Sequence, residues 1–531
     1  MLNFTQIMFE YNDVPGANNY KITITSVDNA PPFFLEIKNK SLACIISDLE
    51  FGRSYKWHFE AFNKKKLIFK SEDFNFIINK YPLVDHDLYK TEIEISKKGV
   101  FNNDIIFLDY LGTAIDRTGK PIWFYPYRSA DGRLEPNLRN IRMTNNGTIT
   151  FQDNDNCYET DVAGRVLWKA PNDGRVSGDK REFYHHDFRK LKDRTYLTTS
   201  YQYLEQPNFF KPSIESRVRY NTLIQYDAQG KILWTWNEKD HVKKEVLFQG
   251  MDSNSTEVEG THLNGFDYDE IDNAVVMSFR NNSSILKIDK QTGKITYDLS
   301  AYGAQSGMKE PWFARQHGPM VLPGHRLLVY NNNAKDTIKK PSYPKILIIQ
   351  EPINGKPAEI LWEYECSSTR FPKGITGKEG YASPLPNGNI LVCMGGANFA
   401  FEVTPKKEIV WEAYFERFDQ LKKEWTGFSN YRCTSASSLY PKYFTVETVK
   451  ETTVQVNNEG TDEDRYLIEA LAADGKTKIF TDEFILKGRS SRLIKIPGDK
   501  AKNGEINVLV SSLADPYFPK YIVLKGPNKT N

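Results

Sequence analysis

One motif recurs six times along the middle of the chain: a tight turn, usually with an acidic residue and a glycine, and then an apolar pair ending in an aromatic residue. The copies end at Trp123, Trp168, Trp234, Tyr297, Trp362 and Trp411. Successive copies lie 45 to 66 residues apart, which suits a four-stranded sheet with loop insertions. Because one such sheet cannot bury its own faces, the repeat predicts a six-bladed β-propeller. A solenoid or two β-sandwiches is the alternative.

The stretches on either side lack this motif but alternate apolar and polar residues, as in Tyr20-Lys-Ile22-Thr-Ile24 and Ile506-Asn-Val508. Such alternation is typical of strands with one buried face. We therefore expect an all-β protein with three domains. These are a β-sandwich over residues 1–88 that resembles a fibronectin type III module, the propeller over 89–440, and a second β-sandwich over 441–531.

The composition excludes several classes of function. The 70 basic and 68 acidic residues leave a net charge of +2 and no basic face for nucleic acid. No run of 18 apolar residues could span a bilayer. The five cysteines are widely spaced and form no CxxC motif, so neither a zinc site nor a dense disulfide framework is indicated.

The innermost strands of a propeller line its central channel, so residues at one phase of the repeat converge there. Three of the eight histidines, His186, His262 and His317, lie five or six residues before an apolar residue of a predicted strand. This spacing predicts that each histidine lies at the start of a blade's first strand. Other polar residues accompany them or fill the same position in the sixth repeat: Asp187, Asn264, Arg280, Tyr381 and Ser383. We expect these side chains to meet on the axis.

Three interpretations of the cluster stay open. The histidines could be hydrogen-bonded staples between blades, or they could bind iron or zinc. The permanent charge of Arg280 opposes a metal, so we predict none. The third interpretation is a site for an anionic tetrahedral group, with Arg280, Asn264, His186 and His262 as donors. His317 would then act as a nucleophile or proton carrier.

Over roughly residues 100 to 440, the chain resembles the bacterial arylsulfate sulfotransferases in an ordered set of motifs. The motifs are His185-His186-Asp187, Thr261-His262-Leu263-Asn264 followed by Ser278-Phe279-Arg280, Gln316-His317, and Leu385-Pro-Asn-Gly-Asn389. The resemblance implies an enzyme that moves a sulfo group from a phenolic sulfate ester to another phenol. It implies neither a nucleotide sulfate donor nor any other cofactor.

Carried over by motif, His317 would be the sulfated nucleophile. His186, His262, Arg280 and Asn264 would hold the sulfo oxygens or assist proton transfer. Asp187, Tyr381 and Ser383 would supply further polar contacts to small-molecule substrates. The family usually has Asp after the Gln-His pair, whereas Gly318 stands here.

The resemblance also implies export to the periplasm or cell surface, with the signal peptide absent from this chain. A homodimer is one arrangement left open. From another class of function, the alternative is a non-catalytic propeller that binds an anionic ligand or a surface partner through the same channel.

Overall fold

The computed structural model describes residues 1–28, 33–39, 42–82, 89–126, 137–153, 156–243, 254–300, 312–333, 343–368, 378–419, 421–450, 452–497 and 505–525, with residues 245 and 370. Apart from two 3₁₀ turns, η1 (Glu238–Asp240) and η2 (Gly395–Ala397), every element among these residues is a strand. The prediction of an all-β chain is confirmed. None of these helical turns has the length and apolar character needed to span a bilayer.

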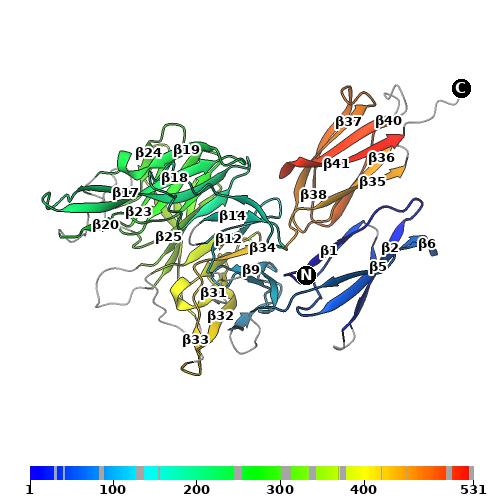
Figure 1. Ribbon diagram of the computed structural model, residues 1–531, viewed down its shortest axis with the longest axis horizontal. Coiled ribbons are helices and arrows are strands. Elements are labelled where there is room, and N and C mark those ends of the chain that lie inside the picture. Colours follow the sequence, from blue (N-terminus) through cyan, green and yellow to red (C-terminus); the bar gives the residue numbers. More distant parts are fainter. Residues whose placement is uncertain are drawn as a thin grey trace.

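Six sheets follow one another between residues 105 and 436 of the described chain, and we call them the ring sheets (Figure 1). The first contains β11 (Pro121–Phe124), β10 (Thr113–Ile115), β9 (Ile105–Leu108) and β34 (Cys433–Ala436). The second contains β12 (Arg139–Met143), β13 (Ile149–Gln152), β14 (Cys157–Thr160) and β15 (Val166–Lys169). The third contains β16 (Phe188–Lys190), β17 (Tyr196–Pro207), β18 (Glu215–Tyr226) and β19 (Ile232–Asn237), with β20 (Glu257–Glu259) beside β18.

The other three ring sheets have the same antiparallel order. The fourth contains β21 (Leu263–Asp269), β22 (Ala274–Phe279), β23 (Ser284–Asp289) and β24 (Ile295–Asp298). The fifth contains β25 (His317–Leu322), β26 (Arg326–Asn331), β27 (Lys345–Gln350) and β28 (Glu359–Glu365). The sixth contains β29 (Tyr381–Pro384), β30 (Ile390–Cys393), β31 (Phe399–Val403), β32 (Ile409–Asp419) and β33 (Glu424–Gly427), with β8 (Tyr89–Ser96) beside β32.

The recurring sequence motif forms a turn between two neighbouring strands of each ring sheet, as in β14–β15, β18–β19 and β31–β32. In the first copy the carboxylate of Asp116 accepts hydrogen bonds from the backbone N–H groups of Thr118 and Lys120. Gly119 follows with φ +86°, a conformation that favours glycine. The aromatic residue then enters the second strand, and Trp123 is fully buried. The motif therefore encodes a hairpin.

The first ring sheet combines segments from the two ends of the repeat region. β34, which holds Cys433, pairs antiparallel with β9, which holds Leu108, so the last strand of the series completes the first sheet. This pairing brings the two ends of the repeat region together in one sheet.

Two further groups of strands flank the ring sheets. The first group contains β1 (Ile7–Glu10) with β4 (Ala43–Ile46), and β3 (Phe34–Asn39), β2 (Asn19–Ser26), β5 (Ser54–Asn63), β6 (Lys66–Lys70) and β7 (Phe74–Ile77). The second contains β35 (Phe444–Lys450), β36 (Thr453–Asn458) and β39 (Ser490–Lys495), and β38 (Lys478–Leu486), β37 (Asp464–Ala472), β40 (Glu505–Ser512) and β41 (Asp515–Lys525). The predicted boundary at residue 88 lies outside the described residues.

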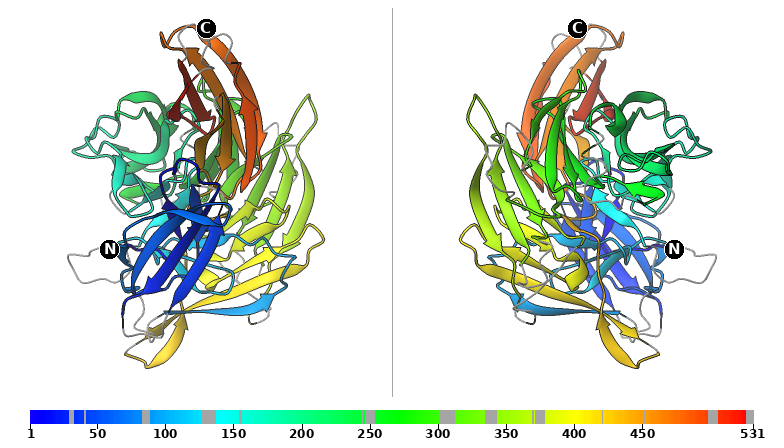
Figure 2. Two further views of the ribbon diagram at one scale, coloured as in Figure 1. Left: turned by 90° about the vertical axis from the view of Figure 1, so that its right-hand side faces the viewer. Right: turned by 90° about the vertical axis from the view of Figure 1, so that its left-hand side faces the viewer.

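The N-terminal strands pack directly on the ring sheets (Figure 2). Phe4 forms a bridge with Trp123, and the side-chain amide of Asn3 donates to the carbonyl of Phe124 at 2.6 Å. One hydrophobic core joins both parts. All five cysteines are free thiols, so no disulfide contributes to this packing.

Candidate active site

Five ring sheets have a non-glycine residue in the left-handed backbone region at or just before their first strand. These residues are Asn140, His186, His262, Arg315 and Glu379, with φ between 50° and 61° in this set. Such a conformation costs on the order of 1–3 kcal/mol and persists where the surrounding structure requires it. The repetition marks one end of the ring sheets as the place where the strained turns gather.

The three histidines lie at or within two residues before the first strand of their sheets, but not all at the same position. His186 and His262 occupy the left-handed position itself, whereas His317 lies two residues after its equivalent, Arg315. A one-residue bulge between His317 and Met320 contributes to this offset, and counting back from later apolar residues does not detect a bulge.

His317 begins β25, and its ring is almost entirely buried. Its Nε2 lies 2.9 Å from the hydroxyl of Tyr431, and the two rings meet edge to face. Burial, followed by the positive charge of Arg432 and the neighbouring His262, lowers the pKa of His317 well below its usual value. The imidazole is therefore neutral at pH 7 and carries a lone pair on one nitrogen.

Gly318 stands where the resembled family usually has Asp, and the structure explains the glycine. Its φ is +50°, and a Cβ atom there would lie 2.6 Å from Cδ2 of Tyr381. The ring of Tyr381 therefore takes the space that an aspartate side chain would need. Orientation of His317 comes from Tyr431 in this chain.

Neighbouring groups set the tautomer of His186. Nε2 of His185 lies 3.1 Å from the carbonyl oxygen of Ser200, so it must carry the proton and donate. With both rings neutral, Nδ1 of His185 then accepts from Nδ1 of His186 at 2.8 Å. Burial is the main cause that lowers the pKa of each ring well below its usual value. Nε2 of His186 is consequently left unprotonated.

His262 has a comparable arrangement with a carboxylate in place of the second histidine. Its Nδ1 lies 2.5 Å from Oε1 of Glu259, which also pairs with Arg219. Burial and then the charges of Arg280 and Arg219 lower the pKa of His262 to about 3, in spite of this carboxylate. The rings of His262 and His186 lie 4.8 Å apart between centroids. Two neutral imidazoles thus face one another.

Several guanidinium groups lie around the histidines. The backbone N–H of Arg280 donates to the carbonyl of His262 at 2.9 Å, and burial and then Arg315 lower the pKa of the Arg280 guanidinium. The guanidinium carbon of Arg139 lies 5.9 Å from the centre of the Tyr431 ring. Its buried Nε has no hydrogen-bond partner among the described residues. These cations make the surroundings of the histidines attractive to an anion.

Asp187 and Asn264 lie deeper and bind protein groups. Asp187 accepts from Nη1 of the fully buried Arg432 at 3.0 Å and from the side-chain amide of Asn140 at 2.6 Å. The amide of Asn264 donates to the backbone carbonyl of Gln316 at 2.7 Å. Both contacts fix the strand ends that carry the histidines.

Tyr381 is completely buried beneath this layer. Its hydroxyl accepts from Nη2 of Arg142 at 2.8 Å, and the guanidinium carbon of Arg432 lies 4.8 Å from the ring centre. Ser383 lies two residues further along β29, and its buried Oγ has no hydrogen-bond partner among the described residues. Among the described residues, neither hydroxyl forms a hydrogen bond with one of the three histidines.

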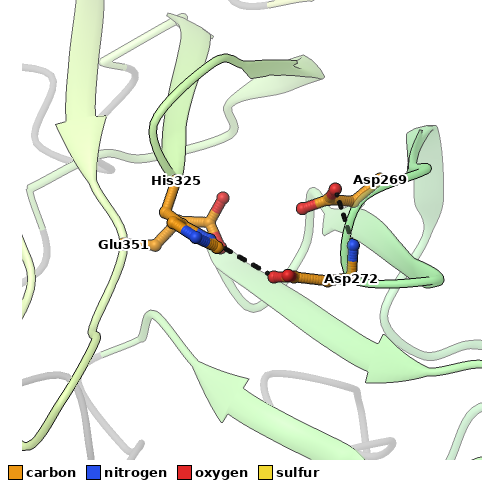
Figure 3. A group of neighbouring side chains, drawn as sticks. All are labelled: Asp269, Asp272, His325 and Glu351. Atoms are coloured by element: carbon orange, nitrogen blue, oxygen red, sulfur yellow. Dashed lines mark hydrogen bonds and ion pairs between the residues drawn. The ribbon is translucent and has the colours of Figure 1, made fainter.

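One cluster has residue types that could bind a metal: Asp269, Asp272, His325 and Glu351 (Figure 3). Asp269 ends β21, the strand that His262 directly precedes, so the cluster lies at the other end of that strand. The ammonium group of Lys287 already lies 2.7 to 2.9 Å from all three carboxylates. Because a lysine supplies the compensating charge, the residues do not fit a cation site well.

Sequence reasoning missed Tyr431, Glu259 and Arg139. Tyr431 precedes the closing strand β34, and only the pairing of β34 with β9 brings it to the site. Glu259 ends the short strand β20, which has no counterpart in the other repeats. Arg139 lies next to Asn140, which has the same left-handed backbone conformation as His186. A comparison of equivalent positions in the repeat could therefore have identified Arg139 as a site residue.

Known proteins were compared with the chain. A search of curated proteins found no match. Three solved structures that resemble it are a Bacteroides caccae protein of unknown function, a streptogramin B lyase and a Myceliophteria thermophila β-propeller domain. Their identities are 14%, 12% and 10%, and their TM-scores are 0.36, 0.32 and 0.23. The alignments cover 59%, 78% and 64% of this chain and 93%, 99% and 86% of those chains. With TM-scores this low, the likenesses do not bear on function.

The profile of the family described as "Arylsulfotransferase (ASST)" matches residues 92–432. The match begins in β8 and ends one residue before the closing strand β34. It therefore spans nearly all of the ring sheets and includes the three histidines and Tyr431. On this match, the chain belongs to the arylsulfotransferase family.

Proposed function

We propose that the enzyme transfers a sulfo group from an aryl sulfate ester to a phenol without a nucleotide donor, through a covalent intermediate on His317. The observation that carries this proposal is the buried, neutral imidazole of His317, whose Nε2 lies beside the Tyr431 hydroxyl. His262 is close enough to affect its pKa, and the ring of His262 in turn lies against that of His186. A neutral imidazole nitrogen is the form that attacks sulfur.

In the first half-reaction Nε2 of His317 attacks the ester sulfur. The N–S bond forms while the bond from sulfur to the phenolic oxygen breaks. The phenolate leaves with the negative charge, and the sulfated imidazole keeps a proton on Nδ1, so charge is balanced. The Tyr431 hydroxyl, which contacts Nε2 before attack, turns to its second acceptor, the carbonyl oxygen of Asn264 at 3.3 Å.

In the second half-reaction an acceptor phenol attacks the sulfur, and the N–S bond breaks. The phenolic proton must leave, and the unprotonated Nε2 of His262 or His186 is the base. Of the two, His262 is better suited, because Glu259 stabilises the imidazolium that forms when the proton arrives. The negative charge passes to the new sulfate ester.

Arginines suit the sulfo oxygens because a guanidinium offers planar, charged hydrogen bonds. Arg280 lies beside His262, and Arg139 lies beside Tyr431 with a buried donor that has no acceptor among the described residues. We assign both to the sulfo group. The reaction needs no metal in this scheme.

The remaining predicted site residues have less direct roles in this proposal. Asn264 and Asp187 are positioning residues, because their hydrogen bonds hold Gln316 and Arg432. Tyr381 supports the backbone at Gly318. Ser383 stays a predicted polar contact.

The finer architecture is part of the same proposal. The six ring sheets would be the blades of a propeller, with the histidines on its axis. The N-terminal strands would form a fibronectin type III-like module, and the C-terminal strands would form a second sandwich. Family membership supports export of the protein, and small aryl sulfates and phenols as its substrates.

The test is to trap the intermediate. The enzyme is mixed with an aryl sulfate in the absence of acceptor, digested under mildly alkaline conditions that spare N-sulfo bonds, and mapped by mass spectrometry. A sulfo group on the peptide that contains His317, absent in His317→Asn, supports the scheme. Intersecting initial-rate lines and no labelled peptide would instead mean direct transfer in a ternary complex.

A further inference from the structure

A cavity of about 680 Å³ lies between the ring sheets and the C-terminal strands. Two strands of the ring sheets, β12 and β16, contribute residues to its lining, and β16 begins two residues after His186. On β12, Arg139 lies beside Tyr431, whereas Arg142 and Met143 line the cavity. The C-terminal strands contribute Arg465, at the start of β37. The cavity and the proposed active site therefore lie at opposite ends of β12.

The lining of this cavity is strongly basic. Its positively charged members are Arg142, Arg189, Lys190, Lys192, Arg194, Lys442 and Arg465. No Asp or Glu is among the described residues that line it. Asn145, Asn146, Thr144 and Thr150 add polar groups. Since the whole chain has a net charge of only +2, this concentration of one sign is a local feature.

Carboxylates outside the lining, one of them buried and two exposed, offset part of this charge. Lys190 pairs with Glu159 at 2.7 Å, and Lys192 pairs with Glu270 at 2.5 Å. Arg465 lies 3.3 Å from a Glu483 oxygen. None of these three carboxylates lines the cavity, so the cavity wall itself stays basic.

The positive charges of Arg142 on β12 and Arg189 on β16 are neutralised less completely by protein groups. Arg142 bonds to the side-chain oxygen of Asn140 at 2.7 Å and to the Tyr381 hydroxyl, and no ion pair of its guanidinium occurs in the described part of the chain. Arg189 pairs with Asp267 at 2.6 Å, yet its buried Nε and Nη2 have no hydrogen-bond partner among the residues that are described. Burial and then the charge of Arg189 lower the pKa of Arg142. An anion in the cavity would relieve this unfavourable arrangement.

The size and the placement of charge indicate more than one anionic group. A cavity of several hundred Å³ suits an organic ligand better than a bare tetrahedral ion. Cations also come from two sides, the ring sheets and the C-terminal strands, which suits a ligand with an anionic group for each side.

We propose that this cavity binds a small organic polyanion that carries two or more phosphate or sulfate ester groups. Arg142 and Arg189 form its floor, and Lys192 and Arg465 lie on opposite sides of it. This site goes beyond the sulfotransferase reaction and does not depend on it.

Isothermal titration calorimetry of the full chain tests the proposal. The probes are pyrophosphate, glucose 1,6-bisphosphate, a disulfated disaccharide and inorganic sulfate. The two esters distinguish a phosphate source from a sulfate source. We expect at least one ester and pyrophosphate to bind at one site per chain, more tightly than inorganic sulfate and more weakly as salt increases.

The decisive variant is Lys192→Gln/Arg465→Gln, whose matched control is Lys97→Gln/Arg492→Gln. Each pair removes two charges, and all four residues form surface ion pairs, with Glu270, Glu483, Glu408 and Asp482. The first double variant should weaken polyanion binding at least tenfold, and the control should bind like the wild type. When Arg142→Gln, which keeps an amide donor, is added to the first double variant, polyanion binding should become weaker still.

Three results would overturn the proposal: no polyanion binds the wild type, both double variants weaken binding equally, or Arg280→Lys abolishes binding. The last result would place the anion among the histidines. Because aryl sulfate turnover is measured separately, failure of this site and failure of the proposed activity are distinguishable.

Discussion

The hydroxyl of Tyr431 lies 2.9 Å from Nε2 of His317 and 3.3 Å from the backbone carbonyl oxygen of Asn264. A phenol has one proton to donate, so the two acceptors compete for it. Donation to Nε2 orients the lone pair of His317, and donation to the carbonyl frees that nitrogen for the sulfo group. One side chain can thus serve His317 before and after sulfation.

Tyr431→Phe removes this hydroxyl and keeps the ring. We expect sulfation of His317 to slow by about 10- to 100-fold, the range for loss of one buried hydrogen bond in a reacting site. Single-turnover release of phenol from an aryl sulfate measures this step. Tyr110→Phe is the control, since its hydroxyl contacts Glu379 and its ring lies 6.1 Å from that of Tyr431. Equal rates for Tyr431→Phe and wild type would exclude Tyr431 from the reaction.

Glu259→Gln should separate the two half-reactions. The carboxylate stabilises protonated His262, which forms only when the acceptor phenol loses its proton. We therefore expect acceptor-dependent turnover to fall by about 10²-fold, at the low end for general base catalysis, while the burst of donor phenol is kept. Glu257→Gln changes a more exposed residue of the same strand and should behave like the wild type. If the burst of donor phenol slows as much as acceptor-dependent turnover does, Glu259 does not act in the second half-reaction alone.

Arg280→Lys keeps the charge but loses the planar pair of donors. Most activity should be lost, by about 10²-fold or more, if the guanidinium holds two sulfo oxygens in the transition state. Measured kcat/KM for an aryl sulfate checks this, with circular dichroism as the test of folding. Near-normal turnover in a folded variant would remove Arg280 from the site.

The pH dependence of kcat/KM reports the protonation of His317 in the free enzyme. Burial and then Arg432 and His262 depress its pKa, so the neutral, reactive form persists below pH 6.5, the usual value for histidine. We expect activity to stay level from pH 8 through 6.5 and to fall only in more acidic buffer. An acid limb with its midpoint at or above 6.5 would show that the imidazole is not held neutral in this way.

Chelation should leave the activity unchanged. The scheme needs no metal, and the acidic cluster around Asp269 already contains the ammonium group of Lys287. The measurement is aryl sulfate turnover before and after prolonged dialysis against a chelator. Loss of activity that a single added metal restores would bring back the metal interpretation of the histidines.

Local signals in the sequence predicted a large part of the structure. Hairpin turns such as Asp116 to Gly119 are encoded within a few residues, because the carboxylate and the glycine together specify the turn. The same locality made the histidines visible, since polar residues at the start of apolar strands stand out.

Contacts between distant segments were beyond this reasoning. Asp187 and Asn264 have the side chains of anion-site residues, yet their partners, Arg432 and Gln316, lie 245 and 52 positions away and could not be paired by spacing. Tyr431 was missed for the same reason. The offset of His317 from the left-handed position that His186 occupies was also beyond this reasoning, because a count of residues reveals neither a backbone conformation nor the bulge after His317.

The pairing of β34 with β9 also sets an order of events during biosynthesis. A ribosome or an export channel releases residue 433 only after nearly the whole repeat region has emerged. Until then the first sheet lacks a strand, and Tyr431, two residues upstream of Cys433, has no fixed place beside His317. His317 would therefore acquire its hydroxyl partner at the final docking step, so under the proposed mechanism an unfinished chain would remain inactive toward phenolic esters.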